Sequence, residues 1–363
     1  MIRRLVFNLH LWTAMIAGAL LILLGGTGAI LAFEEPIDHV LNSGLFYVHP
    51  QSNALPASVL LSRVRQAFPG KRATMLMFGK DPELSTMAVV PGVGSVFIDP
   101  YSGRIMGVRK TNKYFTQTVH QLHIRLLLGD TGSRILGVAG LVLVFLTLSG
   151  IYLWWPLKRV TVAGGKSWRR FNFDLHHAAG FYSSVFLLIL SLTGVMVAFS
   201  DYTVPAMYKI THSESADEET ESTPVPNARP ISPDQAIATA LGTIPGTRLV
   251  SLMPPKGPTG SYRVALHFPE DRTPGGRSHV FIDQFSGAVL SFENSRTAPA
   301  GTRLVNFNRA LHTGDIGGLP TKILACLASL AIIVQAFTGI VMWWKRPTAA
   351  KRPERKAAEE VVR

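Results

Sequence analysis

Residues 122–155 read LHIRLLLGDTGSRILGVAGLVLVFLTLSGIYLWW, a short polar start with a histidine and then a long apolar run that ends in two tryptophans. Residues 311–344 read LHTGDIGGLPTKILACLASLAIIVQAFTGIVMWW, with the same length and the same order of features. An apolar run of about 20 residues can cross a lipid bilayer as a helix. The two stretches predict two membrane spans, and their match predicts an internal repeat. With Leu122-His123 placed on Leu311-His312, Gly150-Ile151 coincides with Gly339-Ile340 and Trp154-Trp155 with Trp343-Trp344.

Two further apolar runs extend the repeat to the whole chain. With Leu9-His10 placed on Leu175-His176, Thr27-Gly28 coincides with Thr193-Gly194 and Phe33 with Phe199. We therefore predict two copies of one unit, which consists of a span, a polar segment on the outer side and a second span. The predicted spans are about Leu9–Phe33, Arg134–Trp155, His177–Phe199 and Thr321–Trp344.

The basic residues gather beside these spans. The formal net charge is +13, and clusters such as Arg3-Arg4, Arg169-Arg170 and Lys345-Arg346 lie before the first span, between the second and third, and after the fourth. This is the positive-inside pattern. We therefore expect no nucleic acid among the partners, both termini in the cytoplasm, and the lipid of a bacterial inner membrane around the spans. The single cysteine, Cys326, allows no intramolecular disulfide, and the absence of Cys-x-x-Cys-His argues against covalent c-type haem.

The two segments predicted to lie in the periplasm are alike. Each has a helix, then four short strands, and the pattern Phe-Ile-Asp-x-aromatic-Ser-Gly, at residues 97–103 and 281–287. We therefore predict a membrane α-helical fold, in which a core of four transmembrane helices carries two periplasmic α+β domains related by an internal two-fold repeat. The predicted division is span 1 (1–33), outside domain 1 (34–112), approach helix and span 2 (113–156), cytoplasmic loop (157–174), span 3 (175–200), linker and outside domain 2 (201–302), approach helix and span 4 (303–346), and cytoplasmic tail (347–363).

Four histidines occupy matching positions in the repeat. An ionisable side chain at membrane depth is costly and is functional by default, and two imidazoles are suitable axial ligands for a non-covalent haem that transfers electrons. His10 and His176 lie where the first and third spans leave the cytoplasm, and His123 and His312 lie just before the second and fourth spans, at the outer face. A two-fold axis along the membrane normal would bring each pair together. The sequence therefore predicts two b-type haems, with the haem iron held by His10 and His176 near one face and by His123 and His312 near the other.

Neighbouring residues leave alternatives open. His177 is an alternative ligand in the third span, although the superposition favours His176. His120 lies one helical turn before His123 and is a second ligand, a propionate partner, a group on the substrate side, or a polar residue of an amphipathic approach helix. Arg125, Arg134 and Arg309 are candidates to pair with haem propionates, or are solvated surface arginines.

The motifs resemble those of the PepSY-associated transmembrane proteins, often called iron-regulated membrane proteins. The similar stretches are Leu9-His10-Leu11-Trp12, Asp174-Leu175-His176, the ending of the second span from Ser149 to Pro156, and the two Phe-Ile-Asp turns. The resemblance covers roughly residues 1–347. It implies two PepSY domains in the periplasm, two b haems in a four-helix core with the same four histidine ligands, and reduction of a ferric siderophore at the outer face, because the family includes a ferric-siderophore reductase.

These observations lead us to expect a transmembrane haem-dependent reductase that takes part in iron uptake. No Gly-rich dinucleotide loop follows a strand, so we expect electrons from a quinol or a cytoplasmic reductase and a ferric siderophore or similar Fe(III) chelate as acceptor. The sequence identifies no catalytic residue beyond the haem ligands. One alternative is a non-catalytic protein whose PepSY-like domains bind or regulate a periplasmic partner. A transporter is a further alternative, to which the mildly polar residues of the spans give little support.

Overall fold

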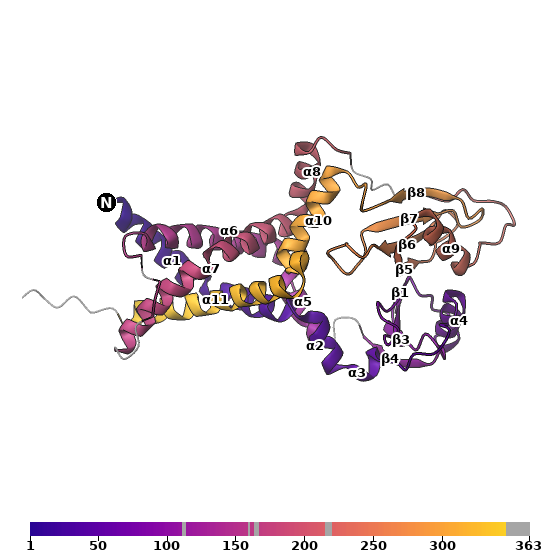
Figure 1. The fold of residues 1–363 in the computed structure, drawn as a ribbon, viewed down its shortest axis with the longest axis horizontal. Coiled ribbons are helices and arrows are strands. Elements are labelled where there is room, and N and C mark those ends of the chain that lie inside the picture. The colour runs from indigo at the N-terminus through magenta and orange to yellow at the C-terminus, as the bar shows by residue number, and fades with distance from the viewer. Residues whose placement is uncertain (111–113, 159, 163–166, 215–219, 346–363) are drawn as a thin grey trace, which may run out of the picture.

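Four long helices form a bundle, and a β-sheet lies beyond one end of it (Figure 1). The computed structural model describes residues 1–110, 114–158, 160–162, 167–214 and 220–345. All four helices are long and apolar enough to cross a membrane. The predicted tail 347–363 and the basic residues Arg159, Lys166 and Arg346 lie outside the described residues. The four helices are α1 (Ile2–Leu31), α6 (Gly129–Trp154), α7 (Trp168–Ala198) and α11 (Leu319–Trp344).

The helices extend beyond the apolar runs from which they were predicted. The helix α7 begins at Trp168 and not near His177, because the polar residues of its first turns find partners. Asn172 donates a hydrogen bond to the carbonyl of Thr338, and Arg170 pairs with the buried carboxylate of Asp174 at 2.9 Å. We call the end of the bundle that carries Arg3, Arg170 and Lys345 the basic end, and the opposite end the sheet end.

The bundle is a closed ring of four helices. The helices α1 and α7 each contact both α6 and α11, so the apolar faces of all four meet along the centre. The buried residues halfway along the bundle are large aliphatic side chains and one alanine, whose burial excludes water from this level. This central layer consists of Leu21, Leu146, Leu187, Ala328 and Ile332.

Short helices at the sheet end connect the bundle to the sheet. The helix α5 (Phe115–Arg125) ends at Leu126, whose φ of 49° is left-handed, and α10 (Ala300–Thr313) ends at Gly314 with a φ of 76°. These left-handed residues turn the chain sharply into α6 and, through the 3-10 helix Asp315–Gly317, into α11. The predicted approach helices are therefore present. The other short helices here are α2 (Glu34–Leu41), α3 (Ser43–Phe46) and α8 (Ser200–Ile210).

Eight antiparallel strands form one sheet in the order β4-β3-β2-β1-β5-β6-β7-β8. One face carries buried residues such as Leu76, Val96, Leu252 and Val264, which pack in a single core with α4 (Ala57–Ala67) and α9 (Pro233–Thr243). In Figure 1 these two helices lie on the side of the sheet away from the bundle. The strands are β1 (Met75–Met77), β2 (Thr86–Val90), β3 (Gly94–Ile98), β4 (Ile105–Arg109), β5 (Arg248–Met253), β6 (Tyr262–His267), β7 (Ser278–Ile282) and β8 (Val289–Glu293).

The sheet differs from the predicted picture of two separate outside domains. Each half of the chain supplies four neighbouring strands, but the edge strands β1 and β5 pair with each other, with Leu76 opposite Leu252 and Met77 opposite Ser251. An unpaired strand edge exposes backbone N–H and C=O groups, and pairing satisfies both edges at once. The two halves therefore share one hydrophobic core.

The Phe-Ile-Asp-x-aromatic-Ser-Gly pattern forms the same turn twice. Asp99 accepts hydrogen bonds from the amides of Tyr101 and Ser102, and Asp283 accepts them from the amides of Phe285 and Ser286. The glycines that close the turns have φ values of 70° and 73°, a conformation that favours glycine. The pattern is therefore explained by turn geometry.

A largely buried ion pair ties α2 to the sheet. Arg109 of β4 donates hydrogen bonds of 2.7 and 2.6 Å to the two carboxylate oxygens of Asp38, and the side chains are only 9% and 13% exposed. The guanidinium also stacks over the Tyr114 ring, 3.8 Å from its centre. This pair fixes the sheet relative to the chain that leaves α1.

Candidate functional site

Each of the four predicted histidines docks on a hydroxyl residue of a neighbouring helix, and that hydroxyl residue is followed by a glycine. We call each of these dipeptides a hydroxyl–glycine step. Nδ1 of His10 lies 2.8 Å from Oγ of Ser149, and Nδ1 of His176 lies 2.8 Å from Oγ1 of Thr338. At the other end, Nδ1 of His123 lies 2.8 Å from Oγ1 of Thr27, and Nδ1 of His312 lies 3.1 Å from Oγ1 of Thr193. The four steps are Ser149-Gly150, Thr338-Gly339, Thr27-Gly28 and Thr193-Gly194.

These contacts determine which ring nitrogen carries the proton. A hydroxyl has one hydrogen to donate, and each of the four hydroxyls lies 2.6–2.7 Å from the backbone carbonyl four residues earlier in its own helix. The hydroxyl oxygen is then left to accept, so the histidine donates from Nδ1–H. Each ring therefore presents Nε2 with a free lone pair, the form that binds a metal.

Further contacts fix the rings that belong to the second half of the chain. Nδ1 of His312 also lies 3.1 Å from the carbonyl oxygen of Leu190, which can only accept. Asn172, one turn before His176, donates to the backbone carbonyl of Thr338, and Asn308, one turn before His312, donates to that of Thr193. Each asparagine thus holds the same step that orients its neighbouring histidine.

The glycine of each step leaves room for the imidazole. A Cβ on Gly194 would lie 2.9 Å from Cε1 of His312, and a Cβ on Gly28 would lie 3.3 Å from Cε1 of His123. The corresponding distances at Gly150 to His10 and at Gly339 to His176 are 3.5 and 3.6 Å. All four rings therefore rest against a glycine, most tightly at the sheet end.

The structure brings His123 and His312 together at the sheet end. Their ring centres are 6.3 Å apart and the ring planes are inclined by 36°. Burial, followed by the nearby rings of His312 and His120, lowers the pKa of His123 to about 3. Burial likewise lowers the pKa of His312. Both imidazoles are therefore neutral at physiological pH, so both lone pairs are free.

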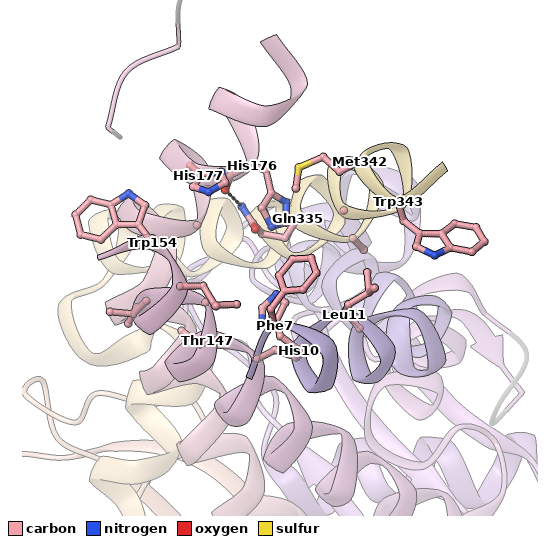
Figure 2. A pocket seen from close by; sticks show the side chains of 18 of the residues that line it. Phe7, His10, Leu11, Thr147, Trp154, His176, His177, Gln335, Met342 and Trp343 are labelled. Atoms are coloured by element: carbon pink, nitrogen blue, oxygen red, sulfur yellow. Dashed lines mark hydrogen bonds between the residues drawn. The ribbon is translucent and has the colours of Figure 1, made fainter. Parts of the chain in front are cut away.

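At the basic end, His10 and His176 line a cavity of about 820 Å³. Its other walls include the aromatic residues Phe7, Trp154 and Trp343, and its depth reaches the central layer at Leu146 and Ile332. Figure 2 shows the His10 ring on α1 and the His176 ring on α7 among these side chains. The volume falls within the range of about 300–1,000 Å³ that is typical of cofactor sites.

Comparison with known families identifies the chain. The model of the PepSY-associated TM region matches residues 7–346, a range that contains all four histidines and their four steps. The chain belongs to the PepSY-associated transmembrane family. No curated protein matches the sequence.

Within this PepSY-associated transmembrane protein, the two alternative histidines have other partners. His177 lies on the cavity wall, but its Nδ1 donates 2.9 Å to the carbonyl of Phe173 in its own helix and not to a hydroxyl–glycine step. His120 lies 3.0 Å from the carboxylate of Glu34 in α2. The geometry therefore favours His176 over His177, and it couples His120 to an acidic residue.

The predicted propionate partners are less well placed. Arg125, Arg134 and Arg309 are exposed, and within the described part of the chain none of the three forms an ion pair. Arg3 and Arg4 line the cavity at the basic end, a role that the sequence did not predict for them. Because they lie beside an apolar run, they indicated only the orientation of the span. An arginine that sets the orientation of a span cannot be distinguished by sequence from an arginine that binds a ligand.

The role of the hydroxyl–glycine steps as histidine partners was also not predicted, although Thr27-Gly28 and Thr193-Gly194 served to align the repeat. Their signal was present, because Thr27 and Thr193 follow His10 and His176 by 17 residues, and Ser149 and Thr338 follow His123 and His312 by 26. Gln335 is a further polar residue that sequence analysis left without a role. Gln335 and Leu146 occupy matching positions in the repeat, because Gln335 lies 23 residues after His312 and Leu146 lies 23 residues after His123. The side-chain amide of Gln335 donates a hydrogen bond of 2.8 Å to the carbonyl of His176 (Figure 2). Both Gln335 and Leu146 line the cavity.

Proposed function

We propose that this protein holds two b-type haems, one between His10 and His176 and one between His123 and His312, and passes electrons through them across the membrane to a ferric chelate. The observation that carries the proposal is the set of four imidazoles, each held in the same tautomer by a hydroxyl–glycine step of another helix. When bound, haem supplies reversible one-electron transfer at its iron.

The spacing of the sheet-end pair fits an iron between two rings. A five-membered ring with bonds of about 1.35 Å has its atoms about 1.1 Å from its centre, and an imidazole nitrogen binds a metal at about 2.0 Å. Two rings on opposite sides of one iron would therefore have centres about 6.2 Å apart. The observed separation of 6.3 Å supports this ligation.

The basic-end cavity fits a flat apolar group with an anionic edge. Its walls are mostly apolar and aromatic, whereas Arg3 and Arg4 stand at the end where α1 begins. Arginine binds carboxylates strongly through paired hydrogen bonds, so these two residues would hold the propionates and fix the direction in which the group enters. In this arrangement His177 remains on the cavity wall as a polar neighbour.

The central layer separates the two histidine pairs. His10 and Thr27, the partner of His123, lie 17 residues apart on α1, or about 26 Å at 1.5 Å per residue. The aliphatic side chains of the central layer fill the bundle between them. They would keep water and protons out of the interval that electrons cross.

The direction of transfer follows from the orientation of the chain. By the positive-inside pattern the basic end faces the cytoplasm of a bacterial inner membrane and the sheet faces the periplasm. Electrons would enter at the His10–His176 site from a quinol or a cytoplasmic reductase and leave at the His123–His312 site. Each electron would reduce one Fe(III) in a ferric siderophore or a similar chelate, which releases iron because siderophores hold Fe(II) far more weakly.

Two measurements on purified protein test the proposal. We expect two iron atoms per chain and a reduced-minus-oxidised absorbance spectrum with b-type Soret and α bands. His123→Ala and His312→Ala should each leave one haem, and His10→Ala and His176→Ala should each leave the other. His177→Ala is the matched control and should keep both. A protein without these bands would be a PepSY-domain protein that binds or regulates a partner, and the proposal would be wrong.

A further inference from the structure

Four methionines lie together on one face of the sheet, where the strands from the two halves of the chain meet. On β1, Met75 and Met77 point to the same face, because successive strand residues alternate. Met87 of β2 lies directly opposite Met77. On β5, Met253 follows Leu252, which pairs with Leu76, so Met253 lies on this face beside β1. We call these four residues the methionine patch.

The hydrophobic core does not account for these residues. The opposite face of the same strands carries Leu76, Ala88 and Leu252, each of which is completely buried. The side chain of Met77 is 37% exposed, and Met75, Met87 and Met253 are partly exposed. The patch therefore covers the open face of the sheet, the face turned toward the membrane bundle in Figure 1.

The register brings the thioether sulfurs within reach of one another. Residues directly opposite in an antiparallel pair have Cβ atoms about 4.5–5.5 Å apart, and diagonal neighbours at about 7–8 Å are still within reach of long side chains. Met77 and Met87 form a direct pair, and Met75 is diagonal to Met87. Methionine side chains are flexible enough to converge on a common point.

Within the described residues, the strand neighbours that pair with the patch on this face carry no charged or imidazole ligand directed at it. The residues that pair with its members on this face are Val89, Phe97 and Ser251. Arg263 pairs with Met253, but its guanidinium lies over the Phe281 ring, on the side away from β1. Among these pairing partners the only oxygen donor is the neutral Ser251 hydroxyl, which is a weaker ligand for a divalent ion such as Zn²⁺ than the imidazole, carboxylate or thiolate groups that usually bind it.

We propose that Met75, Met77 and Met87, with Met253 at their edge, form a binding site for a soft monovalent metal ion, Cu(I) or Ag(I). Thioether sulfur selects such ions over hard cations, and uncharged ligands suit an ion of single charge at a partly exposed site. The site is separate from the four histidines and does not depend on the function proposed for them.

The test is a titration of the full-length detergent-purified protein with silver nitrate in chloride-free buffer, in which isothermal titration calorimetry measures the heat of binding. All variants are made in a Cys326→Ser background, because the Cys326 thiol would otherwise bind Ag(I) more tightly than any thioether. We expect one saturable site in this background. Met77→Leu and Met87→Leu should each weaken Ag(I) binding at least tenfold, and the triple variant that also carries Met75→Leu should lose it. Leucine keeps the volume of methionine, so the sheet should tolerate these changes. Met207→Leu, which removes a buried thioether of α8, is the matched control and should bind as the Cys326→Ser parent does.

A second measurement needs no methionine variant. With methyl-labelled methionine in the same Cys326→Ser background, one equivalent of Ag(I) should shift the methyl resonances of the patch and leave most of the other six methionines unchanged; the chain has ten in all. Equal Ag(I) affinity in the triple variant, or shifts confined to methionines outside the patch, would overturn the proposal. Binding of Zn²⁺ at the patch with comparable affinity would also contradict it.

Discussion

The distance between the glycine of each hydroxyl–glycine step and its histidine ring predicts how much haem a Gly→Ala change removes, and this distance is shortest at Gly194. In Gly194→Ala the new Cβ would lie 2.9 Å from Cε1 of His312. Carbon atoms in contact are normally about 3.5–4.0 Å apart, so the ring would have to move by about 0.6–1.1 Å. The ring is also held by Nδ1 contacts to Thr193 and Leu190, and it cannot retreat without lengthening them.

Such a displacement is large for a metal ligand. A functional site generally has to be held within about 0.5 Å of its working geometry, and loss of a supporting contact typically lowers metal affinity by about 10–100-fold. We therefore expect Gly194→Ala to lose the haem of the His123–His312 site while the His10–His176 site stays filled. Iron per chain should fall from two to one, and one of the two sets of b-type bands should disappear.

The other three steps supply the controls. Gly339→Ala and Gly150→Ala place a Cβ at 3.6 and 3.5 Å from the ring, which is ordinary contact, and should keep both haems. Gly28→Ala, at 3.3 Å from His123 and 3.2 Å from Oγ of Ser329, should fall between these cases. The reasoning would be refuted if Gly194→Ala kept two haems with an unchanged spectrum, or if Gly339→Ala lost as much haem as Gly194→Ala.

Three further predictions concern polar groups. Gln335→Leu should raise the midpoint potential of the haem at the His10–His176 site, because an apolar side chain disfavours the charged ferric form. Leu146→Gln should lower the same potential. An unchanged potential in both variants would contradict a role for polar wall residues in setting it. Arg109→Met should destabilise β4 by about 2–3 kcal/mol, toward the lower end for loss of a buried ion pair, because the Asp38 carboxylate is 13% exposed and keeps the hydrogen bond from Asn42. Faster hydrogen exchange in β4 of the full chain would measure the loss. Burial raises the pKa of Asp283, but hydrogen bonds from Ser286 and Phe285 outweigh this effect and lower the pKa. The turn is therefore stabilised above the unfolded pKa of about 3.9 and loses that stability as the pH falls through the folded value. Asp283→Asn should remove this acid dependence of the free energy of unfolding.

Much of the architecture is readable from the sequence because it depends on local patterns. The four spans follow from the length of the apolar runs, and all four appear as helices of the required length. The strands follow from short alternating runs between turns, and the two Asp-containing turns follow from residues that bond within three positions of each other. The turn and strand signals each occupy a few consecutive residues, and the span signals each occupy the length of one helix.

The sequence also determined which residue types occupy matching positions in the two halves of the chain. It placed His10, His123, His176 and His312 in register, and the family match over residues 7–346 supports the membership that their motifs suggested. The roles of these histidines as ligands stay a prediction until haem is measured.

The way in which distant groups meet depends on packing between whole elements and could not be read from the sequence. His123 and His312 come from helices 189 positions apart, and their 6.3 Å separation depends on how α5 and α10 pack on α1 and α7. The choice between His176 and His177 depends on a rotation of about 100° around α7, which sequence order does not reveal but the bond to Thr338 does. The joining of β1 to β5 is likewise a pairing of two distant edges. Contacts of this kind depend on the packing of whole elements, whereas spans, strands and turns depend on neighbours along the chain.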